Sequence, residues 1–277
     1  MPEANVGIAV TSSLEPELPE GQQRVYRETL ELLGTHRVPF AVSGAFAFQH
    51  HTGIWRATKD LDLCMTSDAA ARALDLLERE GYRCEVCDAV WLAKAHRDGH
   101  FVDLITGMSN AALNVTDVWI TRATRGAVLG VSTLILSAEE LLASKLFVAR
   151  RERFDGADIA HIVYATRGNL DWTRVLELAG HHWEVLLWSL LLFRYVYPAQ
   201  SMYVPLLVWA ELVNGLMFRL VNRDSAARFR GSLVDEKMFA IDVNEWGLDD
   251  LFSEYRACRA DKIEWQPRGL DPHKNVA

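Results

Sequence analysis

The sequence predicts an α+β protein in which a mixed α and β part is followed by a helical part. Up to residue 136, short apolar runs bounded by Gly, Pro or Asp alternate with amphipathic helical patterns. From residue 137 to about 220 the apolar spacing is helical almost throughout. The chain has 277 residues, enough for one large domain or two ordinary ones. We therefore expect a flexible leader over 1–20, an α/β core over 21–136 and a helical domain over 137–277.

The first elements of the core are a helix, a strand and a second helix. Residues 21–34, "GQQRVYRETLELLG", carry apolar residues at helical spacing, and Gly34 is expected to end this helix. The apolar run "VPFAVSG" (38–44) predicts a short buried strand that turns sharply at its glycine. A short helix over 45–51 can follow the turn.

A strand over "DLDLCM" and a helix over 66–81 come next. The helix has Thr66, Ser67 or Asp68 as N-cap candidates, and Gly81 is expected to end it.

Strands are then predicted over 82–86, 90–96 and 101–106, and "RDGH" turns the last two into a hairpin. A further strand near 127–135 precedes "SAEELLASKLFVARRERF" (137–154). This segment predicts one long helix capped by Ser137, with Glu140 completing a capping box.

Composition limits the possible partners. The formal net charge of −8 provides no general attraction to nucleic acid, and "ARRER" (149–153) is the compact basic cluster. Nucleic acid is therefore possible but not favoured. Residues 1–20 lack the basic start and apolar core of a signal peptide, and the chain has four cysteines. Both observations predict a cytoplasmic protein.

The apolar stretch from Trp183 to Leu220 does not predict a membrane span. Its uncharged part lies between Arg194 and Glu211 and includes two prolines, which makes it shorter than the roughly 20 apolar residues that cross a bilayer. Buried helices or a subunit interface explain it better, so a homodimer through these helices is possible.

Asp60 and Asp62 stand one residue apart in "WRATKDLDLCM". In a strand, both carboxylates point to one face while Leu61 and Leu63 point to the other. Two like charges held this close are unfavourable unless a cation lies between them. The alternative is a solvated edge strand with alternating polar residues.

Asp103 lies within the apolar run Phe101–Ile105, where packing alone does not call for a charge. With Asp60 and Asp62 it can hold two divalent cations, which would activate an acceptor hydroxyl and stabilise a leaving pyrophosphate. Asp103 can then also accept the hydroxyl proton. We expect Asp103 on a strand beside that of Asp60 and Asp62 and on the same face of the sheet. The alternative is an aspartate at a hairpin edge.

Ser43 and Gly44 end a predicted strand where a helix begins. The free N–H groups of that helix can receive a phosphate, Gly44 allows the backbone to approach it, and the Ser43 hydroxyl can add a hydrogen bond.

These pieces resemble the nucleotidyltransferases of the polymerase-β superfamily, especially the minimal and abortive-infection-type members. The matching residues are Ser43-Gly44, "RATKDLDL" (56–63) and Asp103. The resemblance implies a mixed sheet with flanking helices. It also implies that the appended apolar helices, the segments from Trp183 to Leu220, form the second wall of the nucleotide cleft. It also implies Mg²⁺ or Mn²⁺ as cofactor and a nucleoside triphosphate such as ATP as donor. Arg56 and Thr58 are expected to support the site, Arg56 by pairing with a metal-site carboxylate or a phosphate.

The segment after residue 137 extends the resemblance. Lys145 is expected to reach the phosphates, and Arg151, Asp155 and Asp158 match an R-x-x-x-D-x-x-D pattern that lines the nucleotide in this group. The alternative is a solvated helix face with an Arg–Asp pair.

The sequence thus predicts a metal-dependent nucleotidyltransferase that moves a nucleoside monophosphate from an NTP to a hydroxyl and releases pyrophosphate. A protein or small-molecule acceptor is favoured, and tRNA is possible. The alternative is a non-catalytic nucleotide-binding or toxin–antitoxin partner protein with the same fold. Two departures from the family pattern would favour it: Ala45, and a longer interval between Gly44 and Asp60.

Overall fold

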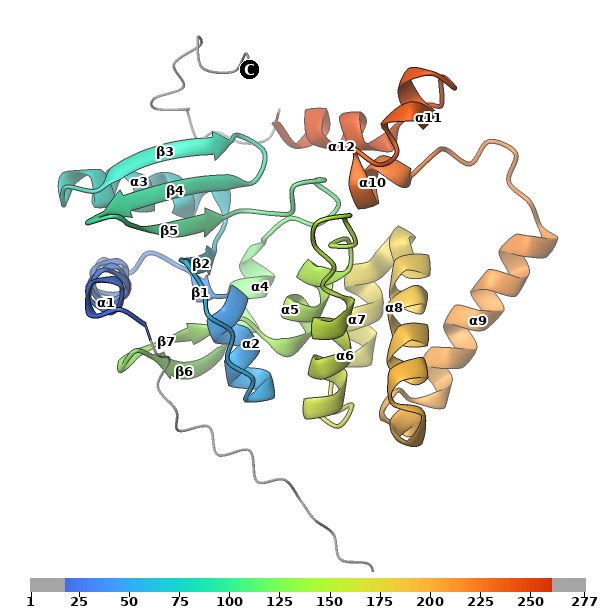
Figure 1. Ribbon diagram of the computed structural model, residues 1–277, viewed down its shortest axis with the longest axis horizontal. Coiled ribbons are helices and arrows are strands. Elements are labelled where there is room, and N and C mark those ends of the chain that lie inside the picture. Colours follow the sequence, from blue (N-terminus) through green and yellow to red (C-terminus); the bar gives the residue numbers. More distant parts are fainter. Residues whose placement is uncertain (1–17, 261–277) are drawn as a thin grey trace, which may run out of the picture.

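A seven-stranded mixed sheet forms the N-terminal half of the protein (Figure 1). The computed structural model describes residues 18–260, so most of the expected leader, residues 1–17, lies outside the described residues. The strand order is β3-β4-β5-β2-β1-β7-β6. The strands are β1 (Ala41–Val42), β2 (Asp60–Cys64), β3 (Arg83–Asp88), β4 (Leu92–Arg97), β5 (His100–Ile105), β6 (Thr124–Val128) and β7 (Val131–Ile135).

Two parallel pairings join segments that are distant in sequence. β2 pairs with β5 in parallel and places Asp62 opposite Asp103, and β1 pairs with β7 in parallel. The other neighbouring strands are antiparallel. The sheet is therefore mixed, as the family resemblance implied.

The structure corrects two strand predictions. The run 38–44 contributes only the two residues of β1, because Pro39 has no N–H to donate to a ladder and the chain turns into a helix at Gly44. The single strand expected near 127–135 is a hairpin of β6 and β7. Leu129 and Gly130 both have positive φ and form the tight turn between the two strands.

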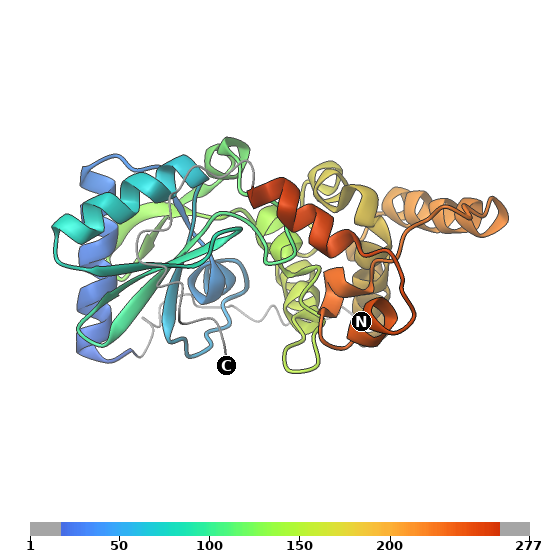
Figure 2. The ribbon, with the colours of Figure 1, turned by 90° about the horizontal axis from the view of Figure 1, so that it is seen from above.

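Three of the helices cover the sheet. α1 (Glu20–Thr35) runs one residue past Gly34, and α3 (Ser67–Arg79) begins after Thr66, whose side chain accepts a hydrogen bond from the backbone N–H of Ala69. Figures 1 and 2 show α1 and α3 on one face of the sheet and α2 (Gly44–Thr52) on the other, between the sheet and the helical half. The short α4 (Asp117–Thr121) precedes β6.

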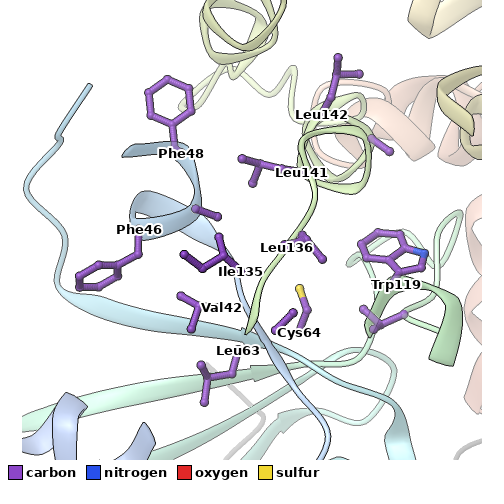
Figure 3. Close-up of a cluster of buried hydrophobic side chains, with 14 of the residues drawn as sticks. Val42, Phe46, Phe48, Leu63, Cys64, Trp119, Ile135, Leu136, Leu141 and Leu142 are labelled. Atoms are coloured by element: carbon purple, nitrogen blue, oxygen red, sulfur yellow. The ribbon is translucent and has the colours of Figure 1, made fainter. Parts of the chain in front are cut away.

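The core continues from the sheet into the helical half. Figure 3 shows side chains of β1, β2 and β7 meeting those of α2 and of α5 (Ala138–Lys145). Leu61 and Leu63 are fully buried, as the two-residue period predicted. Phe46 and Phe48 of α2 are buried as well and point in different directions (Figure 3). α2 is therefore held firmly between the sheet and α5.

The long helix expected over 137–154 ends at Lys145. Its start is as predicted, since Ser137 accepts a hydrogen bond from the N–H of Glu140 and bonds the Glu140 side chain. The chain then folds back: the N–H of Asp155 donates to the carbonyl of Val148 at 2.8 Å, and residues 150 and 153 bond each other in a tight turn. This fold-back lets Arg153 form an ion pair with Asp155.

The remaining helices stack away from the sheet. They are α6 (Gly156–Ala165), α7 (Trp172–Ala179), the 3-10 turn η1 (Gly180–His182), α8 (Trp183–Val196), the 3-10 segment η2 (Pro198–Tyr203) and α9 (Leu206–Val221). The two prolines of the apolar stretch interrupt it, as expected. None of the helices between residues 18 and 260 combines the length and the apolar character needed to cross a bilayer.

The expectation of buried helices is right for α8 and wrong for most of α9. α8 packs against α6, and its Leu186, Leu190 and Phe193 are fully buried. α9 packs on α8 at the edge of the molecule, where Val208 and Leu212 are its buried residues (Figure 1). Among the described helices α9 packs mainly on α8, so its outer apolar face is exposed.

Three short helices complete the described chain: α10 (Gly231–Asp235), α11 (Ala240–Asn244) and α12 (Leu251–Ala260). α12 returns to the sheet, where Arg256 binds Asp88 of β3 at 3.0 Å and the Ser109 carbonyl at 2.6 Å. The domain division near residue 136 stays a prediction.

Candidate active site

A cavity of about 490 Å³ lies between the sheet and the helices α5 and α6. The carboxylates of β2 and β5 line one side, and residues of α5, α6 and the turn before α6 line the other. Its lining residues fall between Ser43 and Asp158. Within the described chain, α8 and α9 contribute none of them, so the expectation that the apolar helices form the second wall is wrong. α5 and α6 lie between those helices and the cleft.

Asp60, Asp62 and Asp103 converge in this cavity. The pleat of β2 points Asp60 and Asp62 to one face, and the parallel pairing of β5 brings Asp103 beside Asp62. One carboxylate oxygen from each residue lies within 4.8 Å of the others. The prediction that Asp103 lies on the neighbouring strand and on the same face is confirmed, and a solvated edge strand is excluded because β2 is central in the sheet.

The electrostatics of the trio suit a divalent cation. Burial, together with the neighbouring Asp60 and Asp103, raises the pKa of Asp62 to about 7. Burial also raises the pKa of Asp103, and its ion pair with Lys94 offsets only part of that effect. Carboxylate oxygens are the ligands that Mg²⁺ and Mn²⁺ prefer, and a cation among them would relieve the repulsion. The donor set therefore fits the metal that the resemblance implied.

The Asp62 carboxylate leaves no room for a side chain at residue 44, which is glycine. Gly44 has φ +57°, and a Cβ built on it would lie 1.7 Å from Asp62 Oδ2. Its N–H opens α2, whose N-terminus faces the cavity through Ser43, Gly44 and Ala45. Ser43 is buried and its backbone N–H donates to the Asp62 carbonyl at 2.8 Å. The glycine thus leaves space for the Asp62 carboxylate. From the sequence, Gly44 was expected only to let the backbone approach a phosphate.

Thr58 and Arg56 precede the trio on the same segment and contact different partners. Thr58 Oγ1 donates to Asp60 Oδ1 at 2.5 Å and so orients that carboxylate. Arg56 forms an ion pair with Asp158 and lies over the Phe48 ring. Of the two partners expected for Arg56, the metal-site carboxylate is wrong, because Arg56 pairs with Asp158 of α6. The phosphate stays a prediction.

Lys145, Asp155 and Asp158 form a buried ionic network in the opposite wall. Lys145 Nζ donates to Asp155 at 3.1 Å and to Asp158 at 2.7 Å. Burial would raise the pKa of Asp155, but Arg153 and Lys145 outweigh it and lower that pKa below its usual value. All three residues line the cavity. The solvated helix face considered above is excluded for these residues, since each is less than a tenth exposed.

Two further cations of the site were missed by the sequence analysis. Arg153, and not Arg151, contacts Asp155, through two bonds of 2.9 Å, while the Arg151 N–H binds Asp235. The sequence predicts an unbroken helix there, whereas the structure ends α5 at Lys145. Lys94 of β4 binds both oxygens of Asp103. Its position follows from the "RDGH" hairpin: the turn pairs Arg97 with His100 and hence Lys94 with Asp103.

No protein-family model matches the chain, and no curated protein matches it. Among solved structures, the antibiotic-resistance factor ANT(2'')-Ia has a TM-score of 0.41 at 16% identity, over 66% of this chain and 96% of that one. An antigenic nucleotidyltransferase-like protein from Paracoccidioides brasiliensis has a TM-score of 0.42 at 17% identity, over 68% and 95%. The lincosamide antibiotic adenylyltransferase LnuA has a TM-score of 0.37 at 17% identity, over 52% and 96%.

These structural neighbours are nucleotidyltransferases, the class that the motifs resemble. The TM-scores of 0.37–0.42 are too low to transfer an activity or a substrate to this chain. Its chemistry has to be argued from its own residues.

Proposed function

We propose that the protein is a divalent-metal-dependent nucleotidyltransferase that moves a nucleoside monophosphate from an NTP to a hydroxyl and releases pyrophosphate. The observation that carries the proposal is the convergence of Asp60, Asp62 and Asp103 at the N-terminus of α2. The side chains that face them across the cavity include Lys145 and Arg153. Carboxylates for a metal opposite cations for phosphate are the two requirements of phosphoryl-group transfer.

Each part of the site has a role in this proposal. Asp60, Asp62 and Asp103 would hold Mg²⁺ or Mn²⁺, which when bound supplies charge neutralisation at the triphosphate and a more acidic acceptor hydroxyl. Thr58 keeps the Asp60 carboxylate in its orientation.

The other residues would receive the donor. The free N–H groups in the first turn of α2 would receive a phosphate. Arg56, Lys145 and Arg153 would neutralise the triphosphate, while Asp155 and Asp158 hold these cations in place. The NTP, with ATP as the first candidate, would therefore lie between the two walls.

For the acceptor, we favour a protein or a small molecule. The cavity of about 490 Å³ is of the size that holds a nucleotide-sized ligand. The net charge of −8 weighs against tRNA. A cytoplasmic location is part of the proposal. It is supported by the four cysteines, Cys64, Cys84, Cys87 and Cys258, all of which are unpaired.

The test is transfer of label from α-³²P NTPs. The protein is incubated with each of the four NTPs and Mg²⁺, alone and with cell extract separated into protein, RNA and small-molecule fractions. We expect Mg²⁺-dependent label in one fraction and stoichiometric pyrophosphate. Binding of NTP without transfer to any fraction, under conditions where the protein is folded, would support the non-catalytic alternative instead.

We further propose a homodimer through α9. Its outer face carries Leu207, Ala210, Asn214, Met217 and Val221 at alternating spacings of three and four residues, the pattern of a helix-pairing stripe. Leu207 is 82% and Val221 77% exposed.

Asn214 lies midway along this stripe. In an antiparallel pairing of two copies about a twofold axis near Asn214, each asparagine would meet its own counterpart. An apolar partner would leave its amide unsatisfied. This favours a second copy of the chain over an unrelated apolar surface.

We expect the wild-type protein to be a dimer by sedimentation or light scattering, and Leu207→Glu to be a monomer. A buried charge at a helix-pairing stripe is strongly unfavourable. Ile241→Glu, at an apolar residue of α11 that is 45% exposed, is the matched control and should stay dimeric. A wild-type monomer, or equal dissociation of both variants, would contradict the proposed interface.

A further inference from the structure

Lys94 stands directly opposite Asp103 in the sheet. The antiparallel register of β4 and β5 pairs the two residues, and the turn at Asp98 and Gly99, both with positive φ, sets that register. Lys94 Nζ donates to Asp103 Oδ1 at 2.6 Å and to Oδ2 at 2.9 Å. One ammonium group therefore engages both oxygens of the third carboxylate.

The position of this ammonium is determined by its surroundings. On its other side Lys94 stands opposite Glu85 of β3. Glu85 instead bonds His96 at 2.9 Å and Arg83 at 3.3 Å, so the ammonium pairs with Asp103 and not with Glu85. The ammonium lies 4.2 Å from the centre of the Phe101 ring, which is two residues before Asp103 on the same face of β5. The Lys94 side chain is 23% and that of Asp103 10% exposed. A charge-assisted pair that is this shielded from water persists in solution, unlike an exposed one.

A cation that uses Asp103 as a ligand has to displace this ammonium, whereas within residues 18–260 no cationic side chain forms an ion pair with Asp60 or Asp62. Lys145 and Arg153, whose charges lower the pKa of Asp62, are bonded to Asp155 and not to Asp62. Thr58 binds one Asp60 oxygen as a neutral donor. The three carboxylates are therefore unequal toward metal.

We propose that Lys94 is a built-in competitor for the divalent cation at Asp103, so that the site fills in two unequal steps. The first cation binds at Asp60 and Asp62. The position that uses Asp103 fills only when Lys94 is displaced. This inference rests on the proposed function, because it takes the three carboxylates to be a metal site. Lys94 is thus a positioning residue that controls when the third carboxylate is available.

The test is binding of Mn²⁺ alone to the full-length protein, measured by electron paramagnetic resonance and calorimetry without nucleotide. The wild type should show one tight class of Mn²⁺ and one weak class. Lys94→Met should tighten the weak class by about tenfold or more, the effect of removing a charge-assisted pair. Lys94→Gln, which keeps one hydrogen bond to Asp103, should lie between the two and covers the case in which Lys94→Met fails to fold.

Lys59→Met is the matched control. Lys59 follows Thr58 in sequence next to Asp60, is exposed and has no ion pair among the residues that the structure describes. Lys59→Met removes the same positive charge from the neighbourhood of the site without removing an ion pair to a carboxylate. The affinities of both Mn²⁺ classes should therefore change little. In the double variant Lys94→Met/Asp103→Asn the gain should vanish, which assigns it to Asp103.

The outcomes separate the two proposals. A wild type that binds no Mn²⁺ would overturn the proposed metal-dependent function. A wild type that binds Mn²⁺ normally, with Lys94→Met indistinguishable from it, would overturn the role of Lys94 alone. Equal tightening in Lys59→Met would do the same, because it would show a general effect of charge.

Discussion

Asp62→Asn is expected to abolish Mg²⁺-dependent nucleotidyl transfer while leaving the protein folded. The change removes one of the three converging carboxylates and keeps the size of the side chain. Loss of a group that merely supports a metal ligand costs about 10–100-fold, and loss of a ligand should exceed that. Asp60→Asn should behave in the same way. The measurement is label transfer from α-³²P NTP to the acceptor fraction.

The same variant should be at least as stable as the wild type in metal-free buffer. Burial, together with Asp60 and Asp103, raises the pKa of Asp62 to about 7, so its charged form is unfavourable in the folded protein. A raised carboxyl pKa contributes stability that is fully present below the unfolded value of about 3.9 and is lost as the pH rises through the folded value. The wild type should therefore lose stability between about pH 4 and pH 7 relative to Asp62→Asn.

This prediction is tested by the melting temperatures of the wild type and Asp62→Asn, measured across this pH range in buffer with a metal chelator. Asp68→Asn, an exposed carboxylate in the first turn of α3, is the control and should keep full activity and the pH dependence of the wild type. A melting temperature of Asp62→Asn well below that of the wild type at pH 7 would indicate that Asp62 is an ordinary structural residue.

Gly44→Ala is expected to destabilise the protein strongly and to disrupt the site. The new Cβ would lie 1.7 Å from Asp62 Oδ2 and 2.7 Å from its Cγ, so α2 or the carboxylate has to move. The positive φ of +57° adds backbone strain of about 1–2 kcal/mol for a residue with a side chain. Overpacking typically costs about 1–3 kcal/mol more. We expect a total loss of about 3 kcal/mol in the free energy of unfolding, measured by denaturant titration.

Gly130→Ala separates strain from collision. Gly130 has φ +79° in the β6–β7 turn, and a Cβ there meets no atom within 4 Å, so this variant should show the strain alone. In the double variant Gly44→Ala/Asp62→Ala the collision with the carboxylate is removed, and the loss should fall toward that of Gly130→Ala. If the double variant is as unstable as the sum of its single changes, Asp62 is not the group that requires glycine at residue 44.

The three carboxylates could be predicted because the signals that identify them lie within a few residues of each aspartate. Two-residue alternation placed Asp60 and Asp62 on the face opposite the buried Leu61 and Leu63, and the apolar setting of Asp103 marked it as unusual. The break after Lys145 could not be predicted in this way. "LFVARRERF" reads as a continuation of the helix, and only the pairing of residues 148–155 with one another moves Arg153 into the cleft.

By itself, the sequence determined the order of helices and strands around the site and the side chains that carry its charge. These follow from spacing, capping and turn residues, all of which act over a few positions. The tertiary structure decided which charges meet. The parallel pairing of β2 with β5 brings Asp103 beside Asp62. Asp158 of α6 forms an ion pair with Arg56, and Lys94 of β4 forms one with Asp103. Among residues 18–260, the tertiary structure also left the outer face of α9 exposed. Pairing between distant segments depends on the packing of the whole sheet and of the helices against it, and no local pattern records that.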